Sequence, residues 1–126
     1  MPLTYRIDRD ARLVRTFAHG VVTDADVLAH KEELAADPRF EPGMNQLSDV
    51  RGIERLDVST SGIRQFVAHD ARHAERFAGH RMAIVANEDV VFGMARMYQT
   101  MSDVNVGVFR SIEEALAFLG QAGTER

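Results

Sequence analysis

Three consecutive hydroxyl residues, Ser59, Thr60 and Ser61, stand at the start of a stretch with helical periodicity. A helix N-terminus presents unpaired backbone N–H groups and the positive end of the helix dipole, so it favours a bound or covalent phosphate. The same residue types are preferred as helix caps, and an ordinary cap is the commoner outcome. The cluster is therefore a candidate site for phosphorylation or anion binding.

A carboxylate interrupts the apolar face of this predicted helix. Asp70 falls among apolar residues at helical spacing, namely Ile63, Phe66, Val67, Ala74 and Phe77. A carboxylate in such a place must be paired, hydrogen-bonded or protonated. Asp70 is either a ligand-pocket residue or a structural one, paired with an arginine or placed where the face opens, and the structural interpretation is the simpler.

His69 and His73 lie four residues apart on the same helix, a spacing that suits a metal ion. The zinc-protease motif HExxH is absent, because Asp70 and not a glutamate follows His69. Both histidines project off the apolar face, and the sequence offers no third ligand. We expect a solvated pair and no metal site.

Sequence patterns for catalysis are missing. There is no P-loop, no GxGxxG after a strand and no GxSxG turn. The chain has no cysteine, which excludes disulfides, thiolate zinc sites and a cysteine nucleophile. We therefore expect a protein that is not an enzyme and needs no cofactor.

Composition indicates an ordinary globular protein. The 126 residues are 45% hydrophobic and 27% charged, which suits one domain over residues 1–126. A net charge of −4 with scattered basic residues, of which Lys31 is the only lysine, argues against nucleic-acid binding. The sequence shows no signal peptide and no apolar run that would span a membrane, so we expect a cytoplasmic protein.

Periodicity predicts strands and helices that alternate after an initial hairpin. The expected strands cover Leu3–Asp8, Leu13–Ala18, Met44–Val50, Met82–Ala86 and Val104–Phe109, with Gly20 ending the second. The expected helices run from Thr23 to Pro38, from Ser59 to Phe77, from Asn87 or Asp89 to Met101, and from Ser111 to Leu119. The order β-β-α-β-α-β-α-β-α predicts an α/β fold with one mixed, mostly parallel sheet.

The third predicted helix carries a stripe formed by Val90, Val91, Met94, Met97, Tyr98 and Met101. Methionines at this spacing usually fill a core, and they also line adaptable binding surfaces. Met94 and Met97 are therefore candidate pocket residues, as are Asp49 and Asn87, which follow two predicted parallel strands. Phe92 points away from the stripe beside Arg96, and this pair would suit a partner or homodimer surface.

The element order resembles that of STAS domains, the fold of the sporulation anti-anti-sigma factor SpoIIAA. Within that group the chain is most similar to the SpoIIAA-like proteins, which are related to the CRAL-TRIO lipid-binding fold. The likeness includes Asp49 and the run Asp57–Ile63, which is similar to the family's Asp-Ser-Ser-Gly-Leu signature. It also includes the segments Ala83–Asn87 and Phe92–Met97. Val58 and Ser59 interrupt the signature.

This resemblance implies two functions of different classes. One is a non-catalytic regulatory module that binds a partner protein and is phosphorylated near the start of the second helix. Ser61 is then the nearest match to the acceptor, followed by Thr60 and Ser59. The alternative is a carrier of a small molecule or lipid, with an apolar pocket under the second and third helices.

Overall fold

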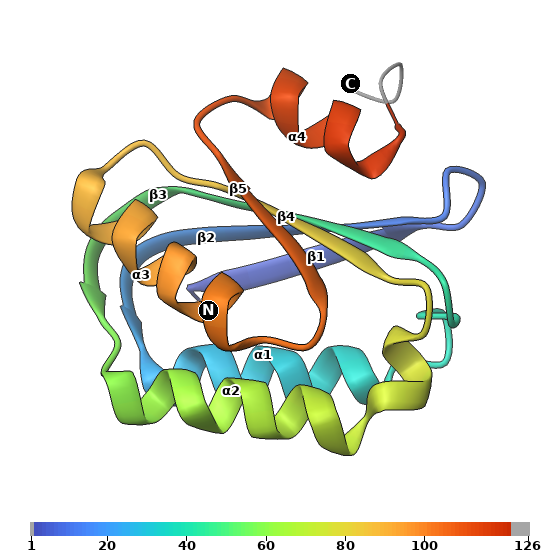
Figure 1. Ribbon diagram of the computed structural model, residues 1–126, viewed down its shortest axis with the longest axis horizontal. Helices are drawn as coiled ribbons and strands as arrows, with labels where there is room; N and C mark the ends of the chain where they lie inside the picture. The colour runs from blue at the N-terminus through green and yellow to red at the C-terminus, as the bar shows by residue number, and fades with distance from the viewer. Residues whose placement is uncertain (1, 122–126) are drawn as a thin grey trace.

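The structure is a computed structural model that describes residues 2–121. Its centre is one five-stranded sheet in the order β1-β2-β3-β4-β5 (Figure 1). The strands are β1 Leu3–Asp8, β2 Leu13–Thr23, β3 Asn45–Asp57, β4 Arg81–Val85 and β5 Asn105–Phe109. β1 runs antiparallel to β2, and the other three pairs are parallel. The predicted mixed, mostly parallel sheet is confirmed.

Helices cover the two faces of the sheet unequally. α1 Asp24–Ala36, α2 Thr60–Arg72 and α3 Asp89–Met101 pack on one face, and α4 Ile112–Leu119 packs on the other (Figure 1). Parallel strands that are neighbours in sequence and in space are joined by right-handed crossovers. Because β2 to β5 follow one another across the sheet, all three connecting helices must lie on the same face.

The interior strand β4 packs on both faces, as its continuous apolar run predicts. Met82 and Ile84 pack with α2 and α3, while Ala83 and Val85 pack with α4. In α3 the predicted inward face needs one correction. Val90 is 71% exposed because it lies in the first turn on the outer side, whereas Val91 is buried as predicted.

Three of the four helix N-caps are as predicted, and the fourth is not. Thr23 and Asp26 form a capping box, Ser59 caps α2, and Ser111 caps α4. At the start of α3, Glu88 occupies the N-cap position without a side-chain hydrogen bond. Neither Asn87 nor Asp89 has that role.

β2 and β3 are longer than the sequence predicts. Gly20 does not end β2, which continues to Thr23, and the expected loop from Gly52 to Asp57 belongs to β3. Register shifts between the two strands allow the extended ribbon to bend toward the helices beyond the end of β4 (Figure 1). The second helix is shorter than predicted at its C-terminal end. α2 ends at Arg72, and a 3₁₀ turn, η1, spans Ala74–Phe77.

No helix within residues 2–121 has the length and apolar character that crossing a bilayer would require.

Gly20 has a φ of +72° within the bent ribbon, and Gly93 lies at an ordinary φ inside α3. An added Cβ would meet nothing within 4 Å at either position. We predict that Gly20→Ala lowers the free energy of unfolding by about 1–2 kcal/mol through backbone strain. Gly93→Ala should raise it by roughly 0.5–1 kcal/mol, because alanine is the better helix former. Urea unfolding of both variants measures the difference, and equal effects would contradict the backbone argument.

Candidate functional site

A cavity of about 140 Å³ lies between the sheet and helices α1, α2 and α3. The bent ribbon of β2 and β3 closes one side of it. Most of its wall is apolar, and residues from the ribbon, α2 and α3 contribute side by side, among them Val22, Leu56, Ile63, Phe66, Met94 and Ala95. Apolar walls around an unfilled volume are the usual setting of a small-molecule site.

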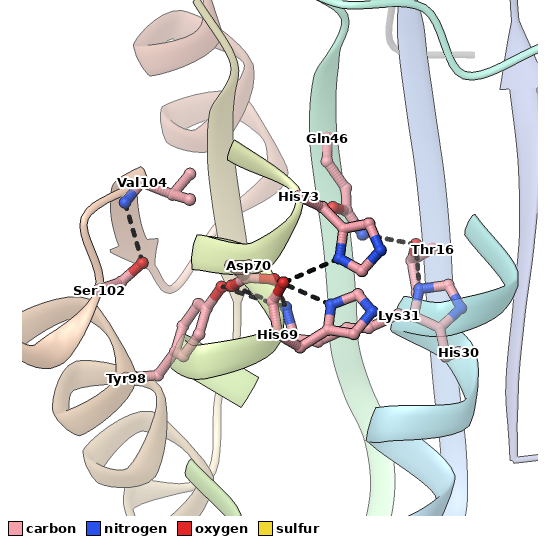
Figure 2. A network of polar contacts seen from close by, with 10 residues as sticks. All are labelled: Thr16, His30, Lys31, Gln46, His69, Asp70, His73, Tyr98, Ser102 and Val104. Atoms are coloured by element: carbon pink, nitrogen blue, oxygen red, sulfur yellow. Dashed lines mark hydrogen bonds and ion pairs between the residues drawn. The ribbon is translucent and has the colours of Figure 1, made fainter. Parts of the chain in front are cut away.

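A chain of polar side chains forms one part of the cavity wall. The Gln46 amide donates to the Thr16 hydroxyl over 3.0 Å, and that hydroxyl lies 3.1 Å from Nε2 of His30 (Figure 2). The Thr16 hydroxyl and Nε2 of His30 therefore share one hydrogen bond, while Nδ1 of His30 is buried without a partner among the described residues. Burial, assisted by the nearby Lys31 charge, lowers the pKa of His30 to about 4, and the ring is neutral at pH 7.

Ser48 adds a hydroxyl to the same wall. It lies on β3 between Thr16 of β2 and Ile84 of β4, and all three line the cavity. Ser48 is only 8% exposed, yet its hydroxyl forms no hydrogen bond with another described residue. Because this hydroxyl borders the cavity, Ser48 is a candidate contact for a polar atom of a ligand, as is the buried Nδ1 of His30, which has no hydrogen-bond partner among the described residues.

Lys31, Asp70 and Tyr98 form a buried cluster where α1, α2 and α3 meet (Figure 2). The Lys31 ammonium donates to both Asp70 carboxylate oxygens, at 3.1 and 3.2 Å, and to the Tyr98 hydroxyl oxygen at 3.1 Å. The Tyr98 hydroxyl in turn donates to Asp70. The predicted ion pair of Asp70 therefore exists, with the chain's only lysine and not an arginine as its partner.

Protonation states within this cluster follow from its geometry. Burial lowers the pKa of Lys31, but Tyr98 and Asp70 raise it by more, so the ammonium stays charged. Burial raises the pKa of Tyr98, which keeps the phenol neutral and able to donate. All three ammonium hydrogens are engaged. The cluster therefore joins three helices and leaves no free cation for an anionic ligand.

His69 does not lie on a solvated face as predicted. It is 2% exposed, because α1 packs along α2 and widens the buried stripe of that helix. Its ring centroid lies 4.3 Å from that of the half-buried His73, and its Nδ1 lies 3.7 Å from an Asp70 oxygen. Across the described part of the chain, no three acidic or histidine side chains are grouped to hold a metal ion.

A second, more polar pocket of about 580 Å³ lies on the other side of the cluster. Asp70 and His80 line it, whereas Lys31 and Tyr98 line the apolar cavity. Phe77 contributes to both. The charged cluster and this phenyl ring therefore stand between the cavity and the outer pocket.

The start of α2 already holds a carboxylate where an anion would bind. Ser59 donates its hydroxyl hydrogen to Asp24 over 2.6 Å and accepts from the Gly62 N–H, while its own N–H donates to Asp24. A phosphate on Ser59 would displace or repel that carboxylate. Thr60 and Ser61 are exposed, so the hydroxyls of these two residues face solvent. Their phosphorylation stays a prediction.

The other predicted site residues are spread over the molecule. Met94 lines the cavity, and Met97 is half-buried in the neighbouring core. Asn87 is exposed before α3, where its carbonyl oxygen accepts from Arg110. Asp49 lies in the middle of β3 and not at its end. Because the adjacent Ser48 faces the cavity, the Asp49 side chain is on the opposite face of the sheet.

The two residues of the predicted interface pair differ in exposure. Phe92 is half-buried, with the Arg110 guanidinium 4.3 Å from its ring centroid, whereas Arg96 is exposed. An arginine therefore partly covers the aromatic ring that we expected to be free.

Several cavity residues were not identified from the sequence: Thr16, His30, Lys31, Gln46, Ser48 and Tyr98 as a polar contact. One signal was present in the strands, since Thr16, Gln46 and Ser48 occupy inward positions of otherwise apolar alternation. Polar residues at such positions indicate either a network or a site. The pairing of Lys31 with Asp70 had no local signal, because 39 residues separate them.

Comparison with known proteins shows the fold and no more. No family model matches the sequence, and no curated protein is significantly similar to it. Among solved structures, the chain is similar to an uncharacterized protein of the DUF3478 family from Shewanella loihica PV-4, described as having a SpoIIAA-like fold. The TM-score is 0.59 with 18% sequence identity, and the match covers 93% of each chain. The predicted SpoIIAA-like fold is confirmed.

We predict that Lys31→Met lowers the free energy of unfolding by about 3–5 kcal/mol, because it leaves Asp70 buried without a counter-charge. The double variant Lys31→Met/Asp70→Leu should recover at least half of this loss. Urea unfolding of both single variants and the double variant measures the coupling. Glu41→Gln, which removes two exposed ion pairs, with Arg9 and with Arg12, is the control and should change little. Additive single losses would show that the two charges act independently.

We also predict that stability falls as the pH drops from about 6.5 to about 4. The unfolded chain takes up a proton on His30 near pH 6.5, whereas the folded chain does so only near pH 4. Stability from the neutral ring is complete above pH 6.5, and its loss toward pH 4 is about 3 kcal/mol. His30→Gln, which keeps a polar partner for Thr16, should reduce the pH dependence of urea unfolding and leave the part that comes from His80, whose pKa burial also lowers to about 4. His19→Gln, at an exposed position, should leave its slope unchanged.

Proposed function

We propose that this protein is a non-catalytic ligand-binding module and that its interior cavity holds a small, neutral, mainly apolar molecule with one hydrogen-bonding group. The observation that supports this proposal is the apolar cavity between the sheet and the three helices, with the unpaired Ser48 hydroxyl in its wall. This is the carrier alternative among the two functions that the resemblance implies.

Cavity size sets the class of ligand. A volume of about 140 Å³ is close to the roughly 150 Å³ of an engineered apolar cavity that binds benzene. A long acyl chain does not fit within it. The ligand is therefore of single-ring size, which is smaller than the lipids that the CRAL-TRIO kinship would imply.

Charge in the wall restricts the ligand further. Lys31 is neutralised by Asp70, and His30 is uncharged at pH 7. An ionised ligand would lose its hydration without meeting a free counter-charge, and that desolvation costs several kcal/mol. A neutral molecule with a hydroxyl or carbonyl group instead satisfies Ser48 and buries its remaining surface against apolar side chains.

A regulatory interaction module is the second candidate. The exposed hydroxyls of Thr60 and Ser61 in the first turn of α2 support it, since a kinase can reach them. Native mass spectrometry of freshly purified protein separates the two candidates. A retained small molecule supports the carrier, a phosphate adduct supports the switch, and a bare mass weighs against the carrier.

We predict that phenol binds the protein more tightly than benzene, and that Ser48→Ala removes the difference. Loss of one hydrogen bond should weaken phenol binding about fivefold and leave benzene binding unchanged. Ala95→Leu fills the cavity and should abolish the binding of both. Two-dimensional NMR titration measures both affinities and reports on the fold of each variant.

Ala117→Leu, at an exposed position on α4, is the matched control and should bind as the parent protein does. Binding of neither compound to the folded parent protein would count against the proposal. So would phenol binding that Ala95→Leu leaves intact, because the ligand would then occupy another place.

A further inference from the structure

The sheet face opposite the cavity is only partly covered. α4 packs against β4, β5, the nearby part of β3 and Leu13 at the start of β2, so the rest of the outer surface of β1 and β2 has no helix over it (Figure 1). An antiparallel pair such as β1 and β2 commonly has one solvated face, so the residue types on this open surface decide whether it is an ordinary solvated face.

Phe17 and Val21 expose apolar surface there. They are 37% and 45% exposed, and together with Val90 they make up the large apolar residues exposed within residues 2–121. Both lie on β2, on either side of the bend at Gly20, and each faces away from an adjacent residue that lines the cavity. Two spaced apolar side chains on one strand suit the apolar residues of a bound segment.

Arginines surround this apolar pair. The Arg6 guanidinium lies 5.7 Å from the centroid of the Phe17 ring, and Arg15 is the register partner of Arg6. Arg51 lies beside Asp49, the register partner of Phe17, and Arg55 is the register partner of Val21. We call this surface the Phe17 face: Arg6, Arg15, Phe17, Val21, Asp49, Arg51 and Arg55.

The charge of the Phe17 face is opposite to that of the chain. It holds four arginines and one aspartate, and Asp49 is already paired with Arg51 at 2.8 Å. The whole chain has a net charge of −4. Asp8 shares this side of β1 but lies four residues beyond Thr4, the register partner of Phe17. A concentrated positive surface with an apolar centre is complementary to carboxylates around apolar side chains.

We propose that the Phe17 face docks an acidic, amphipathic segment of a partner protein. Apolar side chains of that segment pack on Phe17 and Val21, while its carboxylates meet the arginines around them. A second copy of the chain is disfavoured, because a two-fold contact would place the same arginines against each other. Single-stranded nucleic acid is disfavoured too, since Phe17 is the one phenyl ring on this uncovered surface within residues 2–121, and Arg6 lies over it.

The test is a fluorescence anisotropy titration with two labelled synthetic peptides of equal length. One alternates leucine with glutamate, and the other alternates leucine with lysine. We expect the acidic peptide to bind and the basic one not to bind. Phe17→Ser and Arg6→Glu should each weaken acidic-peptide binding at least tenfold. Val90→Ser, at the exposed apolar residue of α3, should leave it unchanged.

Two-dimensional NMR spectra confirm that each variant is folded and locate the peptide. Shifts confined to β1, β2 and the adjoining part of β3 support the proposal. It is overturned if both peptides bind equally, if the two variants bind as the parent does, or if the shifts fall elsewhere. Binding of oligouridine in place of the acidic peptide would also overturn it, and a concentration-dependent dimer that buries Phe17 would do the same.

Discussion

Each strand from β2 to β5 lies beside the strand that precedes it in the chain, and right-handed crossovers then place α1, α2 and α3 on one face. The rest of the structure depends on this constraint. Three helices over one face of five strands form a layer that can hold a cavity. Only α4 remains for the opposite face, and its eight residues cannot cover the sheet. The enclosed cavity and the open Phe17 face are two consequences of one topology.

Burial of charge is the second condition that shapes the helical layer. The chain places its single lysine where three helices meet, and the charge is tolerated because Asp70 and Tyr98 satisfy every ammonium hydrogen. Such a cluster costs desolvation and contributes little net stability, but it strongly disfavours arrangements that separate its members. We infer that it sets how α1, α2 and α3 pack together and, with that, the shape of the cavity beside it.

The two proposed surfaces make different physical demands. The cavity is apolar and neutral, so it selects by size and by one hydrogen bond. The Phe17 face is open and positively charged, so its contacts are salt-sensitive and depend on charge complementarity. They lie on opposite sides of the same strands, with Thr16 facing the cavity and Phe17 facing outward. A ligand that moves β2 would therefore act on both surfaces.

The sequence by itself determined the elements, their order and the fold class, because hydrophobic periodicity and capping residues act within a few neighbouring positions. The apolar stripe of α2, the caps at Thr23, Ser59 and Ser111, and the doubly covered β4 follow from such local rules. It also placed Asp70 on the apolar face of α2, where a carboxylate needs a partner, a proton or an opening in that face. These properties need no knowledge of which segments meet.

Only the tertiary structure decided which residues form the sites. The length of β3 depends on pairing with β2, and the burial of His69 depends on where α1 packs. The partner of Asp70 lies 39 residues away, and the Asp24 carboxylate at Ser59 comes from another helix, 35 residues away. The physical reason is that contacts between distant segments are set by packing of the whole layer, and local periodicity carries no information about them.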